Sequence, residues 1–412
     1  MREILQKAKK SSIEIAKTDE QKRNNVIQSI ALLLSEKSAE IINENIKDLD
    51  KIPDSNPKKD RLVLNNERLN SIIESIKKVI SLPIPTGNVL ADNMLENGLN
   101  IKKISVPFGV IGVIYESRPN VTIDVAVLNI KSGNTTILRG SSEAYFTNLA
   151  LLSIIQTALE LNDLDKNIVQ LMPIERELLH ILLSAENEVD LLIPRGSQEL
   201  INFVRKNSKI PVIETGAGVC HTYVEKSANI KNAAAIVANA KIQRPSVCNA
   251  LDTIIVDKEI TENLITNFID DFLKNEVCIF ADEFSFQILK KYNYPFLYKA
   301  KNEDYGKEYL SLQCTIKTVS GFEEAVLHIQ EFSSKHSECI VTENTNLAEN
   351  FLQIIDAASV YHNASTRFTD GEVFGLGAEI GISTQKLHAR GPFALEKLVT
   401  EKWIIRGNGQ IR

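Results

Sequence analysis

The sequence predicts an α/β protein built on a doubly wound parallel sheet, followed by a second α/β region. Three observations lead to this prediction. The first 80 residues carry apolar positions at helical spacing, short apolar strands alternate with helices between residues 101 and 213, and a second alternating series runs from about residue 222 to 363. Strands that alternate with helices in this way are typical of parallel sheets covered by helices.

The N-terminal block is expected to be helical because its apolar residues recur every three or four positions. Residues 53–57 combine two prolines with Asp, Ser and Asn, which predicts a turn between helices. Pro83, Pro85 and Gly87 are expected to end the block. The residues that carry the helical spacing are Val26, Ile27, Ile30, Leu33, Leu34, Ile41, Ile42 and Ile46.

The two series of alternating strands and helices support the prediction of a parallel sheet. Residues 101–115 are rich in Val and Ile and read as the first β-type segment, with Gly109 and Gly112 inside it. The tail, residues 396–412, carries Trp403-Ile404-Ile405 and is expected to hold an exposed strand that pairs with another segment. The other expected elements are strands at 135–138, 189–193, 211–213, 251–256, 316–319 and 338–341, and helices at about 142–161 and 198–206.

Length and composition limit the possible classes of protein. A chain of 412 residues suits two or three domains, and 43% hydrophobic with 24% charged residues is ordinary for a soluble globular protein. The formal net charge of -6 repels nucleic acid and anionic membranes, so an anionic substrate needs a local cluster of Arg or Lys. The first ten residues lack the apolar core of a signal peptide, and the longest apolar run, residues 106–115, is too short to span a membrane.

The cysteines argue for a reducing compartment. Their number is odd and no C-x-x-C pair occurs, which disfavours a disulfide framework and a structural zinc site. No metal is expected. The five are Cys220, Cys248, Cys278, Cys314 and Cys339.

Two of these thiols are candidates for chemistry. Cys220-His221 lies in an expected strand, where neighbouring side chains point to opposite faces, so this thiol and imidazole should not meet. Cys248 lies in RPSVCNA, residues 244–250, where a proline ends the preceding helix and Arg244 could favour the thiolate. From local chemistry alone, Cys248 is equally well a nucleophile or a buried bystander.

A glycine-rich segment, GLGAEIG at residues 375–381, imitates a dinucleotide-binding fingerprint. Its last gap is three residues instead of two, and no strand–helix–strand unit with a ribose-binding acid follows it. We therefore expect a loop in which the backbone approaches a ligand or another segment closely. If the protein binds a nucleotide, this motif does not hold it.

Three further motifs resemble one known family. They are VPFGVIGVIYESRPNVT at residues 106–122, KSGNTTILRG at 131–140 and STQKLHARGP at 383–392. Together with the cysteine segment they resemble the gamma-glutamyl phosphate reductase (glutamate-5-semialdehyde dehydrogenase) branch of the aldehyde dehydrogenase superfamily, over nearly the whole chain. The resemblance implies an aldehyde dehydrogenase-like α/β fold with a Rossmann-like cofactor domain, an α/β catalytic domain and a small oligomerisation element.

The resemblance also implies an activity. The family reduces L-glutamate 5-phosphate to L-glutamate 5-semialdehyde and phosphate with NADPH, the second step of proline biosynthesis from glutamate. Cys248 is then the nucleophile that forms a thioester, and Asn120 matches the oxyanion-hole asparagine of the superfamily. The alternatives are another aldehyde dehydrogenase-type oxidoreductase of the same fold and, in a different class, an inactive scaffold for a glutamate kinase.

The cofactor residues come from the same resemblance. Arg139 stands where the superfamily often has a lysine at the adenine ribose, and with Ser141 nearby it favours NADPH over NADH through the 2′-phosphate. Gly196 and Ser197 match the segment beside the pyrophosphate, where a helix begins. Glu308 matches, loosely, the acid that binds the nicotinamide ribose.

The substrate is anionic at two places, so its partners should be cationic. The candidates are Arg118, Arg244, Arg367 and, from the third motif, Arg390. Glu214 lies in ETGAG, residues 214–218. In hydrolytic aldehyde dehydrogenases a glutamate in a similar motif activates a water. In this sequence three roles remain for Glu214: contact with the cofactor, proton transfer or a structural role.

The domain boundaries follow the family pattern. Residues 1–87 and 108–216 are expected to bind NADPH, with part of 361–384 returning to that domain, and 217–360 to form the catalytic domain. Residues 88–107 and 385–412 are expected to form the oligomerisation element of a homodimer or larger homo-oligomer. The enzyme is expected in the cytoplasm, with no nucleic-acid or membrane partner, and a transient complex with a glutamate 5-kinase is plausible because the acyl phosphate is labile.

Overall fold

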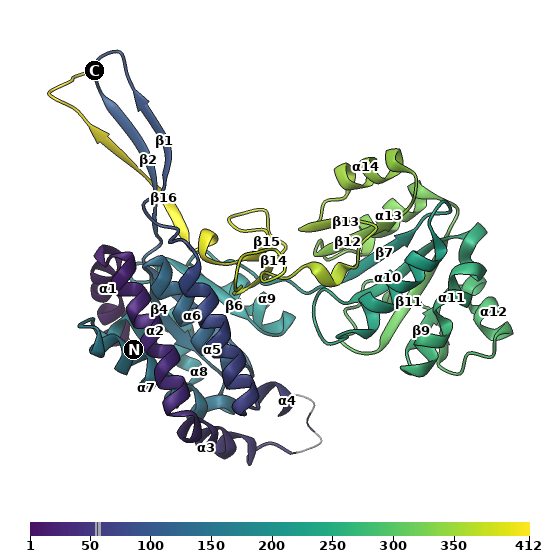
Figure 1. The fold of residues 1–412 in the computed structure, drawn as a ribbon, viewed down its shortest axis with the longest axis horizontal. Helices are drawn as coiled ribbons and strands as arrows, with labels where there is room; N and C mark the ends of the chain where they lie inside the picture. Colours follow the sequence, from purple (N-terminus) through teal and green to yellow (C-terminus); the bar gives the residue numbers. More distant parts are fainter. Residues whose placement is uncertain (54–55, 57–58) are drawn as a thin grey trace. The chain divides into compact units, whose positions relative to one another are not determined.

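The computed structural model describes residues 1–53, 56 and 59–412 and separates into two compact units (Figure 1). The first unit comprises Met1–Thr215, Gly375–Gly381 and Leu387–Arg412. The second comprises Gly216–Phe374 and Ile382–Lys386. The chain thus passes from the first unit to the second after Thr215 and returns near its end.

The N-terminal block is helical, as the apolar spacing predicts. Asp19 and Asn65 cap two of its helices by accepting hydrogen bonds from the backbone of Lys22 and Arg68. Of the predicted turn at 53–57, Pro53 and Asn56 are described and are joined by a backbone hydrogen bond of 3.0 Å, while the rest lies outside the described residues. The helices are α1 (Arg2–Lys17), α2 (Glu20–Glu36), α3 (Ser38–Leu49), α4 (Lys59–Leu62) and α5 (Asn66–Ser81).

A four-stranded parallel sheet forms the centre of the first unit, in the order β5-β4-β3-β6. Alternate residues of its strands pack on opposite sides: Ile111 and Val113 lie in the core with α2, α5, α6 and α7, whereas Val110 and Ile114 lie in the core with α1 and α8. The elements are β3 (Val110–Tyr115), α6 (Asn120–Ser132), β4 (Thr135–Arg139), η1 (Ser142–Ala144), α7 (Tyr145–Leu161), η2 (Lys166–Ile168), β5 (Val169–Leu171), α8 (Arg176–Leu183), β6 (Leu191–Arg195) and α9 (Gln198–Asn207).

One expected strand of this unit is wrong. Residues 211–213 do not form a strand; Val212 makes only an isolated bridge to Leu192. Lys209 N and Ile213 N do bond to neighbouring backbone carbonyls, but only Val212 is paired with a residue of β6. The strand expected at 189–193 begins two residues later, at Leu191, because Val189 and Asp190 still belong to the turn after α8.

One helix is long and apolar enough to cross a membrane by length and composition alone. It runs over Ser142–Leu161, and it is the only such helix in the described parts of the chain. Its inner face packs into the core of the first unit through Leu151, Ile154, Ile155 and Leu159. A core helix passes the same test, so this finding is weak evidence for a membrane span.

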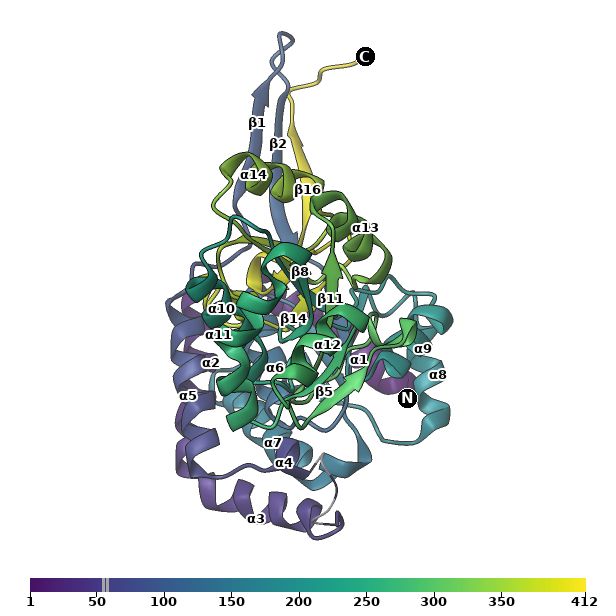
Figure 2. The same ribbon diagram turned by 90° about the vertical axis from the view of Figure 1, so that its right-hand side faces the viewer.

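A three-stranded antiparallel sheet extends away from the helices of the first unit (Figures 1 and 2). Its strands are β1 (Val89–Met94), β2 (Asn100–Pro107) and β16 (Val399–Arg406), in the order β1-β2-β16. The C-terminal strand therefore pairs with β2 over eight residue pairs, from Val399 opposite Pro107 to Arg406 opposite Asn100. Trp403 and Ile405 on β16 are half exposed.

The second unit is a seven-stranded, wholly parallel sheet in the order β10-β9-β11-β8-β7-β12-β13. One core contains residues of α10, α11 and α12, and a smaller core contains residues of α13 and α14, so helices pack on both faces of this sheet. The strands are β7 (Cys220–Val224), β8 (Leu251–Asp257), β9 (Cys278–Ala281), β10 (Leu297–Lys299), β11 (Gln313–Val319), β12 (Ser337–Val341) and β13 (Ser359–His362), and the helices are α10 (Ile230–Ile242), η3 (Lys258–Ile260), α11 (Thr261–Lys274), α12 (Glu283–Lys291), η4 (Asn302–Asp304), α13 (Phe322–Phe332), α14 (Thr345–Ile354) and η5 (Thr366–Phe368).

The glycine-rich segment at 375–381 contains no helix. Gly375 and Gly377 have positive φ angles of 78° and 75°, and a side chain at 377 would meet Leu82. The segment is thus a loop that needs glycine, as expected, and its geometry is not that of a dinucleotide fingerprint. The strands β14 (Gly381–Ser383) and β15 (Gly391–Phe393) and the short helix η6 (Leu395–Lys397) follow it.

Candidate active site

One group of predicted site residues lies in the first unit, at the carboxyl edge of the four-stranded sheet. Because β3, β4 and β6 are parallel neighbours, the loops that follow them open at the same edge. The loop after β3 carries Arg118 and Asn120, the end of β4 carries Arg139 and Ser141, and the end of β6 leads into Gly196 and Ser197. The structure therefore brings these six predicted residues to one edge of one sheet.

Arg139 is anchored at the end of β4. Its Nη1 donates to the carbonyl of Gly140 at 3.1 Å and its Nη2 to the carbonyl of Ile174 at 2.9 Å. Burial lowers the pKa of Arg139, and the nearby positive charge of Arg176 lowers it further. Its Nε is buried and has no hydrogen-bond partner among the described residues. The side chain is thus a partly buried cation beside a second cation.

Ser141 supports the loop that leads to Asn120. Its Oγ accepts a hydrogen bond from the backbone N–H of Ser117 at 3.4 Å. Ser117 has a positive φ of 37° and its hydroxyl donates to Glu143. Ser141 therefore contributes to the backbone turn after β3 in this structure.

Ser197 begins α9, as predicted, and its hydroxyl accepts from Leu200 N as the helix cap. A carboxylate also lies at this helix start: Glu116 Oε2 accepts from Ser197 N at 2.8 Å, and Glu116 Oε1 from Ser197 Oγ at 3.2 Å. A side chain at Gly196 would meet the same carboxylate. An anion thus already uses the N-terminal dipole of α9.

Asn120 begins α6, and its amide is held by a residue that the sequence analysis did not single out. Asn120 Nδ2 donates to Asp124 Oδ2 at 2.9 Å. Burial raises the pKa of Asp124 to about 6, although the hydrogen bond from Asn120 and the charge of Arg195 oppose the shift. The spacing of four residues on a helix could have revealed this pair, because such side chains lie on one face.

The other candidates of the first unit are less informative. Glu214 is only 13% exposed in its side chain and forms an ion pair with Arg205 at 3.5 Å. Arg118 and Arg390 are partly buried. The structural role left open for Glu214 is therefore supported by a visible partner.

A separate group of predicted residues, in the second unit, surrounds Cys248 in the irregular segment between α10 and β8. Cys248 is partly exposed. The backbone of Gly218 packs against it, and a side chain at 218 would overlap the Cys248 carbonyl. Gly218 N donates to Oε1 of Glu308 at 2.9 Å, so Glu308 lies in the second unit beside the backbone that packs on Cys248.

Cys220 and His221 contact different partners, as their strand position predicts. Cys220 Sγ donates to the Cys248 carbonyl at 3.2 Å and lies 3.9 Å from His336 Nδ1. His221 Nδ1 lies 3.0 Å from Glu338 Oε2, with both side chains fully buried. Burial raises the pKa of the Cys220 thiol well above its usual value, and nearby carboxylates raise it further, so it is a neutral thiol.

Two predicted arginines accompany Cys248. Burial lowers the pKa of Arg367, the charge of Arg244 lowers it further, and the charge of Cys248 opposes the shift. Arg367 therefore lies close enough to both Arg244 and Cys248 to feel their charges. Arg367 is thus a cation near both a second cation and the Cys248 thiol, in a chain of net negative charge.

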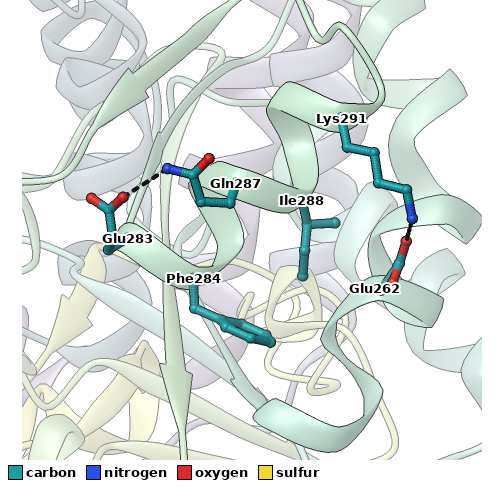
Figure 3. Close-up of a pocket in the computed structure, with 6 residues that line it drawn as sticks. All are labelled: Glu262, Glu283, Phe284, Gln287, Ile288 and Lys291. Carbon is teal, nitrogen blue, oxygen red and sulfur yellow. Dashed lines mark hydrogen bonds and ion pairs between the residues drawn. The ribbon is translucent and has the colours of Figure 1, made fainter.

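A pocket of about 510 Å³ lies elsewhere on the second unit (Figure 3). Six side chains of α11 and α12 line it, and none of them belongs to the predicted site. Two hydrogen-bonded pairs flank its apolar residues Phe284 and Ile288, as the dashed lines of Figure 3 show. No group of three or more potential metal-ligating side chains occurs in the described ranges.

Comparison with known proteins gives the family of the chain. The model of the aldehyde dehydrogenase family matches residues 1–278, which is more than half of the sequence. The chain therefore belongs to the aldehyde dehydrogenase family.

Two similar proteins identify the branch of the family to which the chain belongs. A gamma-glutamyl phosphate reductase of Chlorobaculum parvum is 49% identical over 409 residues, which cover 99% of this chain and 97% of the relative. The crystal structure of a gamma-glutamyl phosphate reductase of Thermotoga maritima matches with a TM-score of 0.94 and 40% identity, covering 100% of this chain and 99% of that one. Within the family, the chain stands in the gamma-glutamyl phosphate reductase branch, which confirms the resemblance carried by its motifs.

One more distant structure shares the fold. An engineered glycolyl-CoA reductase with bound NADP+ matches with a TM-score of 0.69, covering 98% of this chain and 96% of that one. At 15% identity this likeness shows the fold alone.

Proposed function

We propose that the chain reduces L-glutamate 5-phosphate to L-glutamate 5-semialdehyde and phosphate with NADPH, as the second step of proline biosynthesis. The observation that carries the proposal is the nearly full-length match to gamma-glutamyl phosphate reductases, in a chain that keeps a partly exposed Cys248 beside two arginines. The cationic surroundings fit a phosphate leaving group, and the partly exposed thiol fits an attacking nucleophile.

The acyl transfer uses residues of the second unit. The Cys248 sulfur forms a bond to the acyl carbon, the bond from that carbon to the phosphate oxygen breaks, and its electron pair leaves with the phosphate. Arg367 and Arg244 bind the phosphate and stabilise the charge that develops on it. Glu308, fixed on Gly218 N, is proposed to face the nicotinamide ribose. The remaining candidates, Arg118 and Arg390, are proposed for the carboxylate end of the substrate.

Asn120 is proposed as the oxyanion donor. Its amide nitrogen carries two hydrogens, of which one is engaged by Asp124 and the other remains for an oxyanion. A donor held in this way does not need to reorient when negative charge develops on the carbonyl oxygen. Loss of one such donor typically costs about 3–4 kcal/mol of transition-state stabilisation.

The cofactor residues fit NADPH. Arg139 offers a partly buried guanidinium whose Nε lacks a partner among the described residues, beside the positive charge of Arg176. Gly196, without a side chain, allows the Glu116 carboxylate to reach the start of α9, and Ser141 lies next to Arg139 at the same sheet edge. NADPH, when bound, supplies the hydride that reduces the acyl group.

Phosphate dependence is the first prediction. Purified protein should reduce NADP+ with L-glutamate 5-semialdehyde only when inorganic phosphate is present, because phosphate must release the acyl group from Cys248. Cys248→Ala should abolish this activity. Cys314→Ala is the matched control and should retain it, since Cys314 is buried and burial raises its pKa to about 12. Oxidation of the semialdehyde without phosphate, giving free glutamate, would show a hydrolytic aldehyde dehydrogenase instead.

Assembly and location belong to the same proposal. We propose a cytoplasmic homo-oligomer in which residues 88–107 and 385–412 form the oligomerisation element, because β1 and β16 are the outer strands of their sheet and expose apolar side chains such as Met94 and Trp403. The acyl phosphate comes from a separate glutamate 5-kinase, with which a transient complex would shorten the path of a labile intermediate.

A further inference from the structure

A single buried residue links the nucleophile segment to the turn that carries Arg367. Asn249, which follows Cys248, donates through Nδ2 to the carbonyl of Thr369 at 2.8 Å and to the carbonyl of Arg367 at 3.3 Å. In return, Thr366 Oγ1 donates to the Asn249 carbonyl at 2.8 Å. Three hydrogen bonds thus join one residue to both ends of the short helix η5.

The residues of this link are buried, whereas Arg367 is not. Asn249 is 4% exposed, and Thr366 and Thr369 are 0% exposed. Thr369 is also held from the other side, where its Oγ1 lies 2.7 Å from Ser337 Oγ and 2.6 Å from Tyr361 OH. The backbone of the turn is therefore fixed on two sides, and the partly buried Arg367 belongs to this fixed turn.

The chemistry of the link requires an amide. A carboxamide nitrogen has two hydrogens and can serve two carbonyl oxygens at once. A carboxylate at the same place would bring its own acceptor oxygens against the carbonyl oxygens of the turn. An alanine would leave these two carbonyls without this donor. Asn249 Oδ1 itself is buried and has no partner among the described residues, so the amide nitrogen is the end that the site uses.

We infer that Asn249 is a positioning residue, which fixes Arg367 at the phosphate of the acyl-phosphate substrate by tying the turn at residues 366–369 to the segment of Cys248. The inference rests on the proposed function, since it assigns Arg367 to that phosphate. Because Asn249 is bonded covalently to Cys248, the nucleophile and the phosphate-binding cation share one support. Neither can shift without the other while the three hydrogen bonds hold.

The experiment measures phosphate as a substrate in the oxidative direction. Asn249→Ala should raise the KM for inorganic phosphate about tenfold, as expected from the loss of one well-placed charged hydrogen bond, and should raise the KM for the semialdehyde less. Asn249→Ser, which retains one donor, should show a smaller rise and covers the case in which the alanine variant does not fold.

The matched control is Asn45→Ala. Asn45 is also a buried asparagine whose amide donates to a carbonyl, that of Leu62 at 2.8 Å, and to Thr147 Oγ1 at 3.1 Å, but it lies in the helical part of the first unit. It should lower the melting temperature as Asn249→Ala does and leave the KM for phosphate unchanged.

A double-mutant cycle separates this inference from the proposed function. Arg367→Ala alone should raise the KM for phosphate, and in the Asn249→Ala background it should raise it much less. Two results would overturn the positioning role while Arg367 keeps its function. In the first, Arg367→Ala raises the KM for phosphate but Asn249→Ala raises it no more than Asn45→Ala does. In the second, the effects of Arg367→Ala and Asn249→Ala on this KM multiply in the double variant. If Arg367→Ala leaves the KM unchanged, the phosphate assignment fails and Asn249 loses its role with it.

Discussion

At the scale of single residues, Cys220 and Cys248 have different surroundings although one hydrogen bond joins them. Cys220 is fully buried among carboxylates, which raises the pKa of its thiol, while Cys248 is partly exposed near Arg367. Reactivity of a cysteine depends on the thiolate, which cationic surroundings favour and burial disfavours. The distinction between the two thiols thus comes from their surroundings.

One residue-scale prediction concerns the choice between NADPH and NADH. Arg139→Ala should reduce the preference for NADPH over NADH by at least about tenfold, because a guanidinium that binds a 2′-phosphate bidentately makes two charged hydrogen bonds. Comparing kcat/KM for the two cofactors in the wild type and the variant gives the measurement. Arg205→Ala, which removes an exposed guanidinium paired with Glu214, is the control. An unchanged preference in Arg139→Ala would exclude the assignment.

Asp124 makes stability depend on pH. Its pKa is raised to about 6 in the folded protein, from about 3.9 in an unfolded chain. Between these values the folded state binds more protons than the unfolded state, so the free energy of unfolding should fall as pH rises from about 4 to about 6. Asp124→Asn, which cannot ionise, should lack this loss and be more stable at pH 7 by on the order of 2 kcal/mol.

The measurement is chemical denaturation of both proteins at several pH values. The difference between them isolates Asp124 from other titrating groups, such as Asp252, whose pKa burial raises to about 7. Asn120→Ala should raise the upper end of the pH range over which the free energy of unfolding falls, because the hydrogen bond from Asn120 lowers the pKa of Asp124. Parallel curves for the wild type and Asp124→Asn would contradict the prediction.

The candidate site was predictable from the sequence only in part. The Asn120–Asp124 pair follows from helical spacing, which a sequence displays. The Glu116 carboxylate on Ser197 spans 81 residues, and the amide of Asn249 reaches Thr369 across 120 residues. No local pattern indicates such contacts, since tertiary packing brings them together.

At the scale of elements, the alternation of short strands and helices predicted two parallel sheets, and both are present. The failure at residues 211–213 shows the limit of this pattern: three apolar residues satisfy the pattern of a strand, although only Val212 is paired with a residue of β6. The boundary predicted at 189 is too early because the apolar Val189 lies in the turn before β6. Apolar runs therefore indicate which residues are buried more reliably than they indicate where a strand begins or ends.

The C-terminal strand gives the element-scale prediction. Deletion of residues 399–412 removes β16, which should leave the β2 edge unpaired and change the oligomeric mass of the protein. Light scattering after size-exclusion chromatography measures that mass. Deletion of residues 407–412 is the control, because it spares β16 and should leave the mass unchanged. Equal masses for the wild type and the longer deletion would argue against β16 as part of the oligomerisation element.

At the scale of the whole molecule, local pattern predicted fold class but not chain routing. The two units join after Thr215, and residues 375–381 and 387–412 rejoin the first unit although 382–386 belong to the second. Periodicity shows whether a segment is a strand or a helix, whereas the unit to which it returns depends on contacts far apart in sequence. The expectation that part of residues 361–384 returns to the first domain came from the family resemblance and not from such a pattern.

The pairing of β16 with β2 has a consequence for how the protein is made. During synthesis β2 leaves the ribosome almost three hundred residues before β16, its partner from Val399 to Arg406. Leu398, whose carbonyl accepts from the buried Asn134, also comes late. The main part of the second unit, Gly216–Phe374, is meanwhile complete. The first unit is therefore the last to be completed, and a ribosome that stalls before residue 399 leaves a polypeptide with a nearly whole second unit and an unpaired edge on β2, the kind of exposed edge that makes incomplete chains prone to aggregation.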